Sequence, residues 1–374
     1  MFRARSIQSS LSIKDKILSL DYILIFSIFL LGLISILAMY STDGGEFKYH
    51  TNSHILRFFI FFGMFLALSL IQIRFWHSQS YFIYIIFFVL LLGVKYFGLT
   101  SSGSKRWLDL YFMNLQPSEL MKVGLILFLA KYYHRTSIEN INSLRYLFLP
   151  IVALVAPLIL VATQPDLGTS ILIAAGGLTV AWLAGVRVKF FAISGLTFLA
   201  FLPIAISFLK PYQKSRILTF LNPERDPLGA GYQIIQSKIA IGSGGLFGKG
   251  FLQGSQSYLD YLPEKHTDFI FTLFSEEFGF FGSLFILFLY AIIVWRITRI
   301  GNMTRSNFGK LYCFSFATAF FIYVVVNMMM VLGLLPIVGS PLPIMSYGGS
   351  SMMAIMLGLG IAMSCKVYKD TPVN

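Results

Sequence analysis

Ten long apolar runs recur along the chain, and no other feature of the sequence restricts the fold as strongly. Each run is close to the roughly 20 residues that a helix needs to cross a bilayer. Backbone polar groups in lipid must be satisfied within their own segment, so such runs predict transmembrane helices. We therefore expect an all-α polytopic membrane protein that forms a single membrane domain over residues 1–374. The predicted spans are roughly 22–40, 55–73, 80–98, 115–131, 146–162, 167–184, 190–209, 269–295, 311–333 and 342–364.

Composition supports an integral membrane protein. It argues against a soluble domain and against a fold held by disulfides or a cysteine-bound metal. The chain is 56% hydrophobic and its mean hydropathy is +0.75, which is too apolar for a soluble domain of this size. The first run follows four basic residues, as in a signal peptide. It is too long for one, and no small-residue cleavage site follows, so we expect a retained helix. The two cysteines form no disulfide or metal pattern.

The net charge of +13 has a topological explanation. If the N-terminus is cytoplasmic, the cytoplasmic segments hold sixteen of the 29 Lys and Arg residues. The opposite side holds six, apart from seven in one long loop. Cytoplasmic loops are enriched in Lys and Arg, so both termini are predicted to be cytoplasmic. This asymmetry accounts for much of the charge without a nucleic-acid partner. Twelve of the sixteen acidic residues lie on the outer side, which favours chemistry there.

The long outer loop covers residues 210–268 and holds two features. Residues 232–241 are predicted to form a short amphipathic helix along the membrane or a cavity rim. The cluster IGSGGLFGKG fails the Walker A pattern, although its glycine-rich backbone and Lys249 could still contact phosphate. Beyond the loop, SPLPIMSYGGSS at 340–351 opens the last span. Irregular backbone at this depth is tolerated inside protein or around a cavity, so a cavity-lining broken helix is predicted.

Two similar motifs, QPSELMK and TQPDLG, each begin an inward-running helix. In the first, Glu119 and Lys122 are spaced i,i+3 and can form a structural ion pair on one face. Alternatively, Lys122 presents a cation to an anionic substrate, because charged groups at membrane depth usually face a cavity. In the second motif, Asp166 is either an N-terminal acid that meets the helix dipole or part of the same cavity.

The stretch LPEKHTDFIFTLFSEEFG at 262–279 places carboxylates at the mouth of a membrane helix and inside it. Its helix is predicted to start near residue 267 or 268, so Asp268 is either a cap or a rim residue. Glu276 and Glu277 lie about 12 Å deeper at 1.5 Å per residue. That separation is too large for a carboxylate acid/base pair, so both glutamates are predicted to brace the walls. His266 and Asp268 are weak evidence for a metal, and no metal site is predicted.

These motifs, in this order, closely resemble the SEDS proteins, a family named for shape, elongation, division and sporulation. The resemblance covers nearly the whole chain and includes KRWLDL, TQPDLGTS, RILTFLNPERDPLGAGYQ, AIGSGGLFGKG and HTDFIF followed by EE and FG. GSQSYLDYLPEKHTDF and GLLPIVGSPLP are more similar to the RodA branch, which serves cell elongation, than to the FtsW branch. The resemblance implies a ten-helix protein of the bacterial plasma membrane that polymerises peptidoglycan from lipid II.

The resemblance also implies roles for individual residues. The catalytic aspartate of the family corresponds to Asp268, and its charged cavity residues to Glu119, Lys122 and Asp166. Lys122, Arg216 and Lys249 are candidates to neutralise the undecaprenyl diphosphate leaving group.

Partners follow from the same resemblance. They are the undecaprenyl-linked glycan, a class B penicillin-binding transpeptidase and the elongation machinery. The cofactor stays open, because a divalent cation could assist. A flippase of the lipid-linked precursor is the alternative, since ten spans and intramembrane charges also fit transport. A third hypothesis is that the protein is a non-catalytic scaffold for the crosslinking enzyme.

Overall fold

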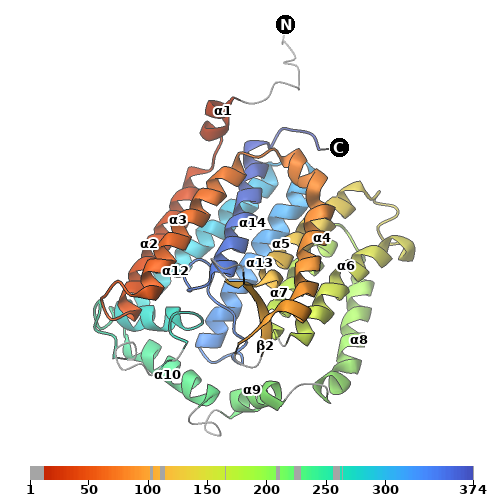
Figure 1. Ribbon diagram of the computed structural model, residues 1–374. Helices are drawn as coiled ribbons and strands as arrows, with labels where there is room; N and C mark the ends of the chain where they lie inside the picture. The colour runs from red at the N-terminus through yellow and green to blue at the C-terminus, as the bar shows by residue number, and fades with distance from the viewer. Residues whose placement is uncertain are drawn as a thin grey trace.

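A computed structural model describes residues 12–101, 104–109, 114–164, 166–207, 211–222, 229–255, 262 and 264–373. It confirms the predicted all-α polytopic fold, because each predicted span overlaps one helix of the bundle in Figure 1. The helices are α1 (Ile13–Leu18), α2 (Tyr22–Thr42), α3 (Tyr49–Ser69), α4 (Ile73–Phe97), α5 (Pro117–Arg135), α6 (Leu144–Thr163), α7 (Leu167–Leu183), α8 (Val188–Ser207), α9 (Pro211–Leu221), α10 (Ala230–Ser243), α12 (Ile270–Met303), α13 (Asn307–Val331) and α14 (Gly349–Val367).

Among the described residues, seven helices are long and apolar enough to cross a membrane, namely α2, α3, α4, α6, α12, α13 and α14. α7 and α8 contain shorter apolar segments. α5 is different, because it carries Glu119, Lys122 and Lys131, yet nearly all of its side chains are buried. It packs against α4, α7, α13 and α14 at the centre of the bundle. Its charges therefore face protein, as expected for ionisable groups at membrane depth.

Different elements lie at the two ends of the bundle. α1 and the C-terminal end of α14 lie at one end, and α9 and α10 lie at the other (Figure 1). The sequence did not predict a small antiparallel sheet of order β1-β2-β3, formed by Leu99–Ser101, Ser104–Asp109 and Asn114–Leu115 between α4 and α5. This sheet matters for the site because β2 carries Arg106 next to the start of α5.

Two predicted helix starts are displaced in the structure. The last span was predicted from residue 342, but α14 begins at Gly349 and continues unbroken. Residues 340–348 form an irregular, largely buried segment in place of the predicted broken helix. Pro341 and Pro343 lack the N–H groups that a helix would use, and Ile344 has a φ of 70°. Similarly, α12 begins at Ile270, so Asp268 precedes the helix and does not cap it.

The predicted amphipathic helix in the outer loop is present as α10, and the glycine-rich segment that follows it packs against α12. α12 is broken at Gly279, which has a φ of 66°. The N–H groups of Phe280 and Phe281, released by this break, donate to the carbonyls of Gly245 and Leu246 at 2.9 and 3.2 Å. In return, the N–H groups of residues 249 and 250 donate to the carbonyls of residues 276 and 277, both at 3.0 Å. The loop therefore completes the broken helix.

Gly248 lies at the centre of this exchange, and its replacement by alanine should be costly. Its φ is 82°, and an added Cβ would lie 2.0 Å from the Glu277 carbonyl oxygen. We expect Gly248→Ala to destabilise the protein by about 2–4 kcal/mol, through backbone strain and overpacking. Gly242→Ala is the matched control, because no atom lies within 4 Å of its added Cβ. Thermal unfolding in detergent should show a lowered midpoint for Gly248→Ala only, and equal midpoints would contradict this account.

Candidate active site

Asp268 lies in the turn formed by residues 264–269, immediately before α12. The Asn327 side chain of α13 donates from Nδ2 to the Asp268 carbonyl at 3.0 Å and to the Ser340 carbonyl at 2.7 Å. The Tyr347 N–H donates to the His266 carbonyl at 2.8 Å. The turn is therefore held by its backbone against α13 and the segment before α14. Its position is fixed without using the Asp268 side chain.

The Asp268 carboxylate is half-buried, and the described residues provide it with no hydrogen bond or ion pair. Burial raises its pKa to about 7, and the nearby Glu264 carboxylate adds to this effect. Arg216 and Arg106 act in the opposite direction, since their positive charges favour the ionised form. A carboxylate with a pKa near neutrality is suited to accept a proton from a substrate hydroxyl. Asp268 therefore has the electrostatic properties of a general base.

Asp166 lies at the start of α7, is 1% exposed and is held by three neighbours. It caps the helix by accepting from the Thr169 N–H at 3.1 Å. Its second oxygen accepts from the Gln116 Nε2 at 2.8 Å and lies 3.9 Å from an Arg106 nitrogen. Both readings of Asp166 are compatible with this geometry, because it caps α7 and also orients a cation beside Asp268. Its functional role stays a prediction.

Glu119 and Lys122 form an ion pair of 2.8 Å within α5, and only 2% and 8% of these residues are exposed. The Tyr323 hydroxyl of α13 lies 3.3 Å from the same Glu119 oxygen and 3.0 Å from the Ser351 hydroxyl of α14. The Lys122 ammonium lies 3.9 Å from the centre of the Tyr323 ring. The pair therefore joins three helices below the site, and the substrate-binding role predicted for Lys122 is untested.

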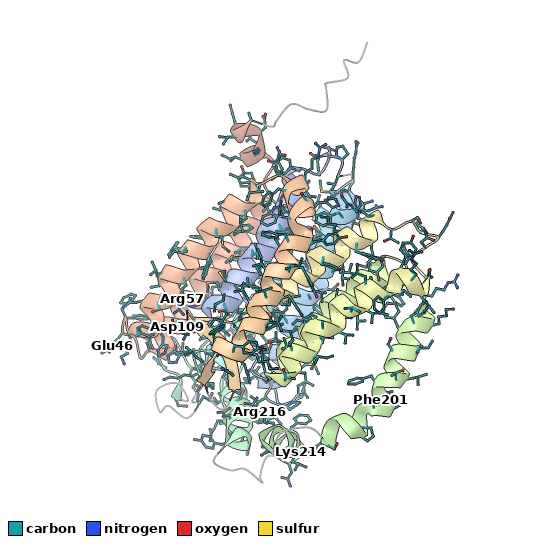
Figure 2. The ribbon with its side chains drawn as sticks, turned by 45° about the vertical axis from the view of Figure 1, so that its right-hand side comes forward. Glu46, Arg57, Asp109, Phe201, Lys214 and Arg216 are labelled. Atoms are coloured by element: carbon teal, nitrogen blue, oxygen red, sulfur yellow. The ribbon has the colours of Figure 1, made fainter. Side chains whose placement is uncertain are left out.

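Arg216 reaches the site from α9, which lies at the end opposite the termini (Figures 1 and 2). Its guanidinium donates from Nη1 to the Ile337 carbonyl at 3.0 Å, which ties α9 to the segment before α14. Because its charge acts on Asp268, it lies within electrostatic reach of the proposed base. Arg216 is thus the predicted leaving-group cation whose location agrees best with that role.

A separate group lies where Lys249, in the loop that completes α12, meets Glu276 and Glu277 of that helix. The Lys249 ammonium contacts Glu276 at 2.6 Å and the Ser255 hydroxyl at 3.0 Å. Glu277 accepts from the Ser41 hydroxyl of α2. These contacts agree with the wall-bracing role predicted for the glutamates. They favour the same structural role for Lys249, because its ammonium would have to leave Glu276 to meet a phosphate.

Sequence reasoning missed Arg106, Tyr323 and Asn327. Asn327 is fully buried, and Tyr323 is 2% exposed. A polar asparagine within the apolar span 311–333 was a usable signal, because polar groups inside membrane helices generally have partners. Arg106 gave no such signal, since the unpredicted β2 strand determines its position.

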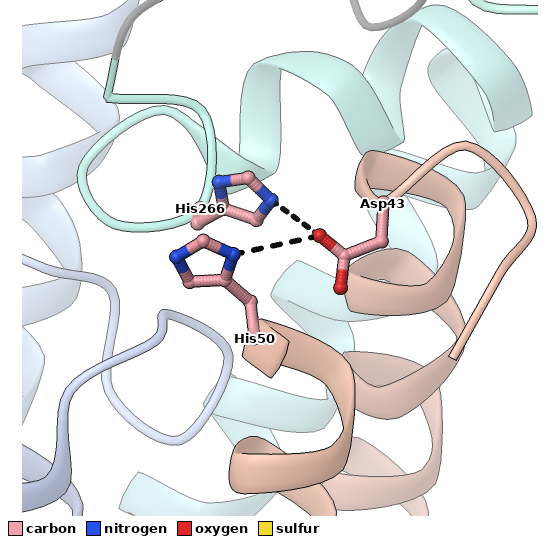
Figure 3. A group of neighbouring side chains, drawn as sticks. All are labelled: Asp43, His50 and His266. Carbon is pink, nitrogen blue, oxygen red and sulfur yellow. Dashed lines mark hydrogen bonds and ion pairs between the residues drawn. The ribbon is translucent and has the colours of Figure 1, made fainter. Parts of the chain in front are cut away.

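A second group of side chains at this end could hold a metal. Asp43, His50 and His266 each offer one ligand atom, and these atoms all lie within 4.8 Å of one another (Figure 3). The group borders a cavity of about 480 Å³, whose lining includes both histidines, Glu264 and Tyr347. The sequence suggested only a weak pair of His266 with Asp268, because the approach of residues 43 and 50 depends on tertiary packing.

Known proteins resemble this chain over most of its length. A family model for FtsW, RodA and SpoVE, described as cell cycle proteins, matches residues 18–371. MrdB of Escherichia coli K12, a peptidoglycan glycosyltransferase, is 45% identical over 297 residues, which cover 79% of this chain and 80% of MrdB.

Solved structures of other proteins also resemble this chain over most of its length. One, described as "Structural coordination of polymerization and crosslinking by a peptidoglycan synthase complex", contains a chain 28% identical with a TM-score of 0.78, covering 93% of this chain and 97% of that one. The rod shape determining protein RodA of Thermus thermophilus is 24% identical with a TM-score of 0.71, covering 94% and 97%, and supports the fold alone.

Proposed function

This chain belongs to the FtsW, RodA and SpoVE family of cell cycle proteins, and from this premise we propose that it is a peptidoglycan glycosyltransferase of cell elongation. Its similarity to MrdB supports the reaction and the elongation role. One observation supports Asp268 as its base: it is a half-buried carboxylate with a pKa near 7, and the charges of two guanidinium groups act on it. Family membership supports the activity, and this geometry supports our proposal for the residues that perform it.

In the proposed reaction, the acceptor is the 4-hydroxyl of the GlcNAc of lipid II. The donor is a growing glycan whose anomeric carbon carries undecaprenyl diphosphate. Asp268 removes the hydroxyl proton while the oxygen attacks the anomeric carbon, because a neutral sugar hydroxyl is a poor nucleophile. The bond to the diphosphate breaks on the opposite face, and its electron pair leaves with the diphosphate. The α-linked donor thus becomes a β-1,4-linked product.

The leaving diphosphate needs positive charge. Arg216 and Arg106 are the favoured sources, because both act electrostatically on Asp268. Lys122 is the next candidate, with the limitation that Glu119 already compensates its charge. Glu119 and Asp166 position cations in this proposal and do not contact the phosphate themselves. Polymerisation by purified protein from lipid II, with gel analysis of glycan length, tests the activity.

The rate of polymerisation should rise with pH through about 7. Asp268 must be ionised to accept a proton, and its pKa is raised to about 7. The activity should therefore be low at pH 5.5 and reach a plateau above pH 8. Glu264→Gln should move the midpoint to lower pH, because the Glu264 carboxylate raises the pKa of Asp268. Single-turnover rates across pH provide the measurement. An unchanged midpoint in Glu264→Gln would contradict the electrostatic account.

Transport of the lipid-linked precursor remains the rival activity. A vesicle assay with fluorescent lipid separates the two, because a flippase moves the lipid across the bilayer without lengthening the glycan. A polymerase instead produces long glycan from lipid that already faces the site. We favour polymerisation because Asp268 precedes α12 at the end of the bundle, and does not lie at mid-membrane.

We further propose cytoplasmic termini and a crosslinking partner of the class B penicillin-binding type. α1 and the C-terminal end of α14 lie at the same end of the bundle (Figure 1), and this arrangement agrees with the concentration of Lys and Arg in the segments predicted to be cytoplasmic. Reporter fusions to each terminus test the orientation. The partner proposal is supported by the solved synthase complex, whose description joins polymerisation to crosslinking. Co-purification of the chain with a single-pass transpeptidase tests it.

A further inference from the structure

Three side chains from distant parts of the sequence meet at the edge of the cavity beside the Asp268 turn. Asp43 is the C-cap of α2, His50 lies in the first turn of α3, and His266 lies in the turn before α12. We propose that Asp43, His50 and His266 bind one divalent transition-metal ion, with Zn²⁺ as the representative ion. Their ligand atoms lie within 4.8 Å of one another, and Figure 3 shows both imidazoles directed at the same carboxylate.

The carboxylate of Asp43 is oriented for this role. Its Oδ1 lies 2.9 Å from the His266 Nε2 and 3.6 Å from the His50 Nδ1. Its other oxygen, Oδ2, accepts from the N–H and the hydroxyl of Thr51 at 2.9 and 2.6 Å. The Thr51 contacts hold the carboxylate so that one oxygen faces the two rings. Supporting hydrogen bonds of this kind orient carboxylate ligands in metal sites.

The two imidazoles are nearly parallel, with ring centres 4.1 Å apart and planes 20° apart. Ligand atoms about 2.0–2.1 Å from a tetrahedral zinc ion lie roughly 3.3 Å from one another. The observed oxygen–nitrogen separations bracket this value, and the two nitrogens lie within 4.8 Å of each other, so the site forms when the imidazoles turn to direct their nitrogens at a common point. An isolated Asp–His hydrogen bond explains the contact with His266. It does not explain why a second imidazole nitrogen, from His50, approaches the same oxygen.

The ligand set indicates the class of ion. Two imidazole nitrogens and one carboxylate oxygen suit Zn²⁺ and other first-row divalent metals, whereas Mg²⁺ and Ca²⁺ prefer oxygen ligands. Three protein ligands leave a fourth position for water. That position is accessible, because His50 and His266 both line the cavity of about 480 Å³. A bound ion would link the α2–α3 connection to the turn that carries Asp268, and so would stabilise the turn.

Metal binding can be measured directly on tag-free, chelator-treated protein in detergent. Calorimetric titration with Zn²⁺ should give one site per chain, and Co²⁺ should give the visible absorption of a tetrahedral complex. His50→Ala and Asp43→Asn should each weaken Zn²⁺ binding by at least tenfold. Zn²⁺ should also raise the thermal midpoint of the wild type and leave that of His50→Ala unchanged.

His134→Gln is the matched control, because it removes a histidine that contacts the Val373 carbonyl near the C-terminus. It should bind Zn²⁺ like the wild type. The proposal is overturned if the wild type shows no stoichiometric site, or if His50→Ala binds Zn²⁺ as tightly as His134→Gln. If His50→Ala does not fold, Asp43→Asn decides the matter, because an amide can keep a contact with Thr51. None of these readouts depends on glycan polymerisation.

Discussion

Replacing Asp268 with asparagine is expected to lower the rate of glycan polymerisation by about 10²–10⁴-fold, the usual contribution of a general base. Asparagine has nearly the same shape, and the Asp268 carbonyl still accepts from Asn327 in the variant, so the turn should keep its position. What is lost is the group that removes the hydroxyl proton. Purified Asp268→Asn should still bind lipid II, and the two readouts together separate chemistry from binding.

The same substitution should not destabilise the protein, which distinguishes a catalytic carboxylate from a structural one. The pKa of Asp268 is raised from its ordinary value of 3.8 to about 7. The folded state thus binds the proton more tightly than the unfolded state, and the destabilisation grows as pH rises from about 4 through 7. At pH 8 the variant lacks this unfavourable charge, so its thermal midpoint should equal or exceed that of the wild type.

Glu46→Gln is the control for removing a carboxylate from the same end of the molecule. Glu46 is exposed in the α2–α3 connection (Figure 2), and among the residues that the structure describes its carboxylate pairs only with the exposed Lys48, at 3.4 Å. Its loss should leave polymerisation and stability unchanged. Undiminished polymerisation by Asp268→Asn would refute the assignment of the base, whereas inactivity combined with a large loss of stability would indicate a structural role.

The helices were predictable because the signal that specifies them is local. About 20 apolar residues in succession satisfy the physical requirement of a membrane span wherever they occur, so each predicted span overlaps a helix. Errors occurred where backbone chemistry or packing overrides composition. The two prolines delay the start of α14, and the break at Gly279 depends on a loop about thirty residues earlier in the chain. Neither effect is visible in hydropathy.

The candidate site also contains some residues that the local sequence reveals and others that only tertiary packing reveals. Glu119, Lys122, Asp166 and Asp268 were identifiable because each stands near the start of a helix, where carboxylates and cations are informative. The partners that orient them were not identifiable, since they belong to other elements. Tyr323 and Asn327 lie on α13, and Arg106 lies on β2. Local motifs therefore give the chemical groups of the site, and tertiary packing decides which of them act together.

Packing also decides which charges are available to a substrate. Lys249 was predicted as a phosphate ligand, and its ammonium contacts Glu276 at 2.6 Å. Arg216 was predicted for the same role and acts electrostatically on Asp268. The two residues look equivalent in the sequence because both are basic residues of the outer loop. Their neighbours differ, which is why we give the leaving-group role to Arg216.

The Glu119–Lys122 pair allows its structural and functional roles to be separated. Lys122→Met should destabilise the protein by about 3–5 kcal/mol, because it leaves the buried Glu119 carboxylate without its cation. In the double variant Glu119→Gln, Lys122→Met, no uncompensated charge remains, and we expect most of the stability to return. Lys48→Met removes one partner of the exposed pair with Glu46 and should cost at most about 1 kcal/mol. Unfolding in detergent micelles provides these values.

Polymerisation by the double variant then decides between the two roles. If Lys122 only balances Glu119, the stable double variant should be about as active as the wild type. If the Lys122 ammonium also stabilises the leaving diphosphate, the double variant should be stable and slow, since methionine cannot supply the charge. We expect the second result, because the ammonium can donate hydrogen bonds to a phosphate oxygen and methionine cannot, although the net charge of the pair is zero in both proteins. Equal loss of stability in the single and double variants would contradict the charge-balance account of the pair, because it would mean that the cost arises from packing and not from charge.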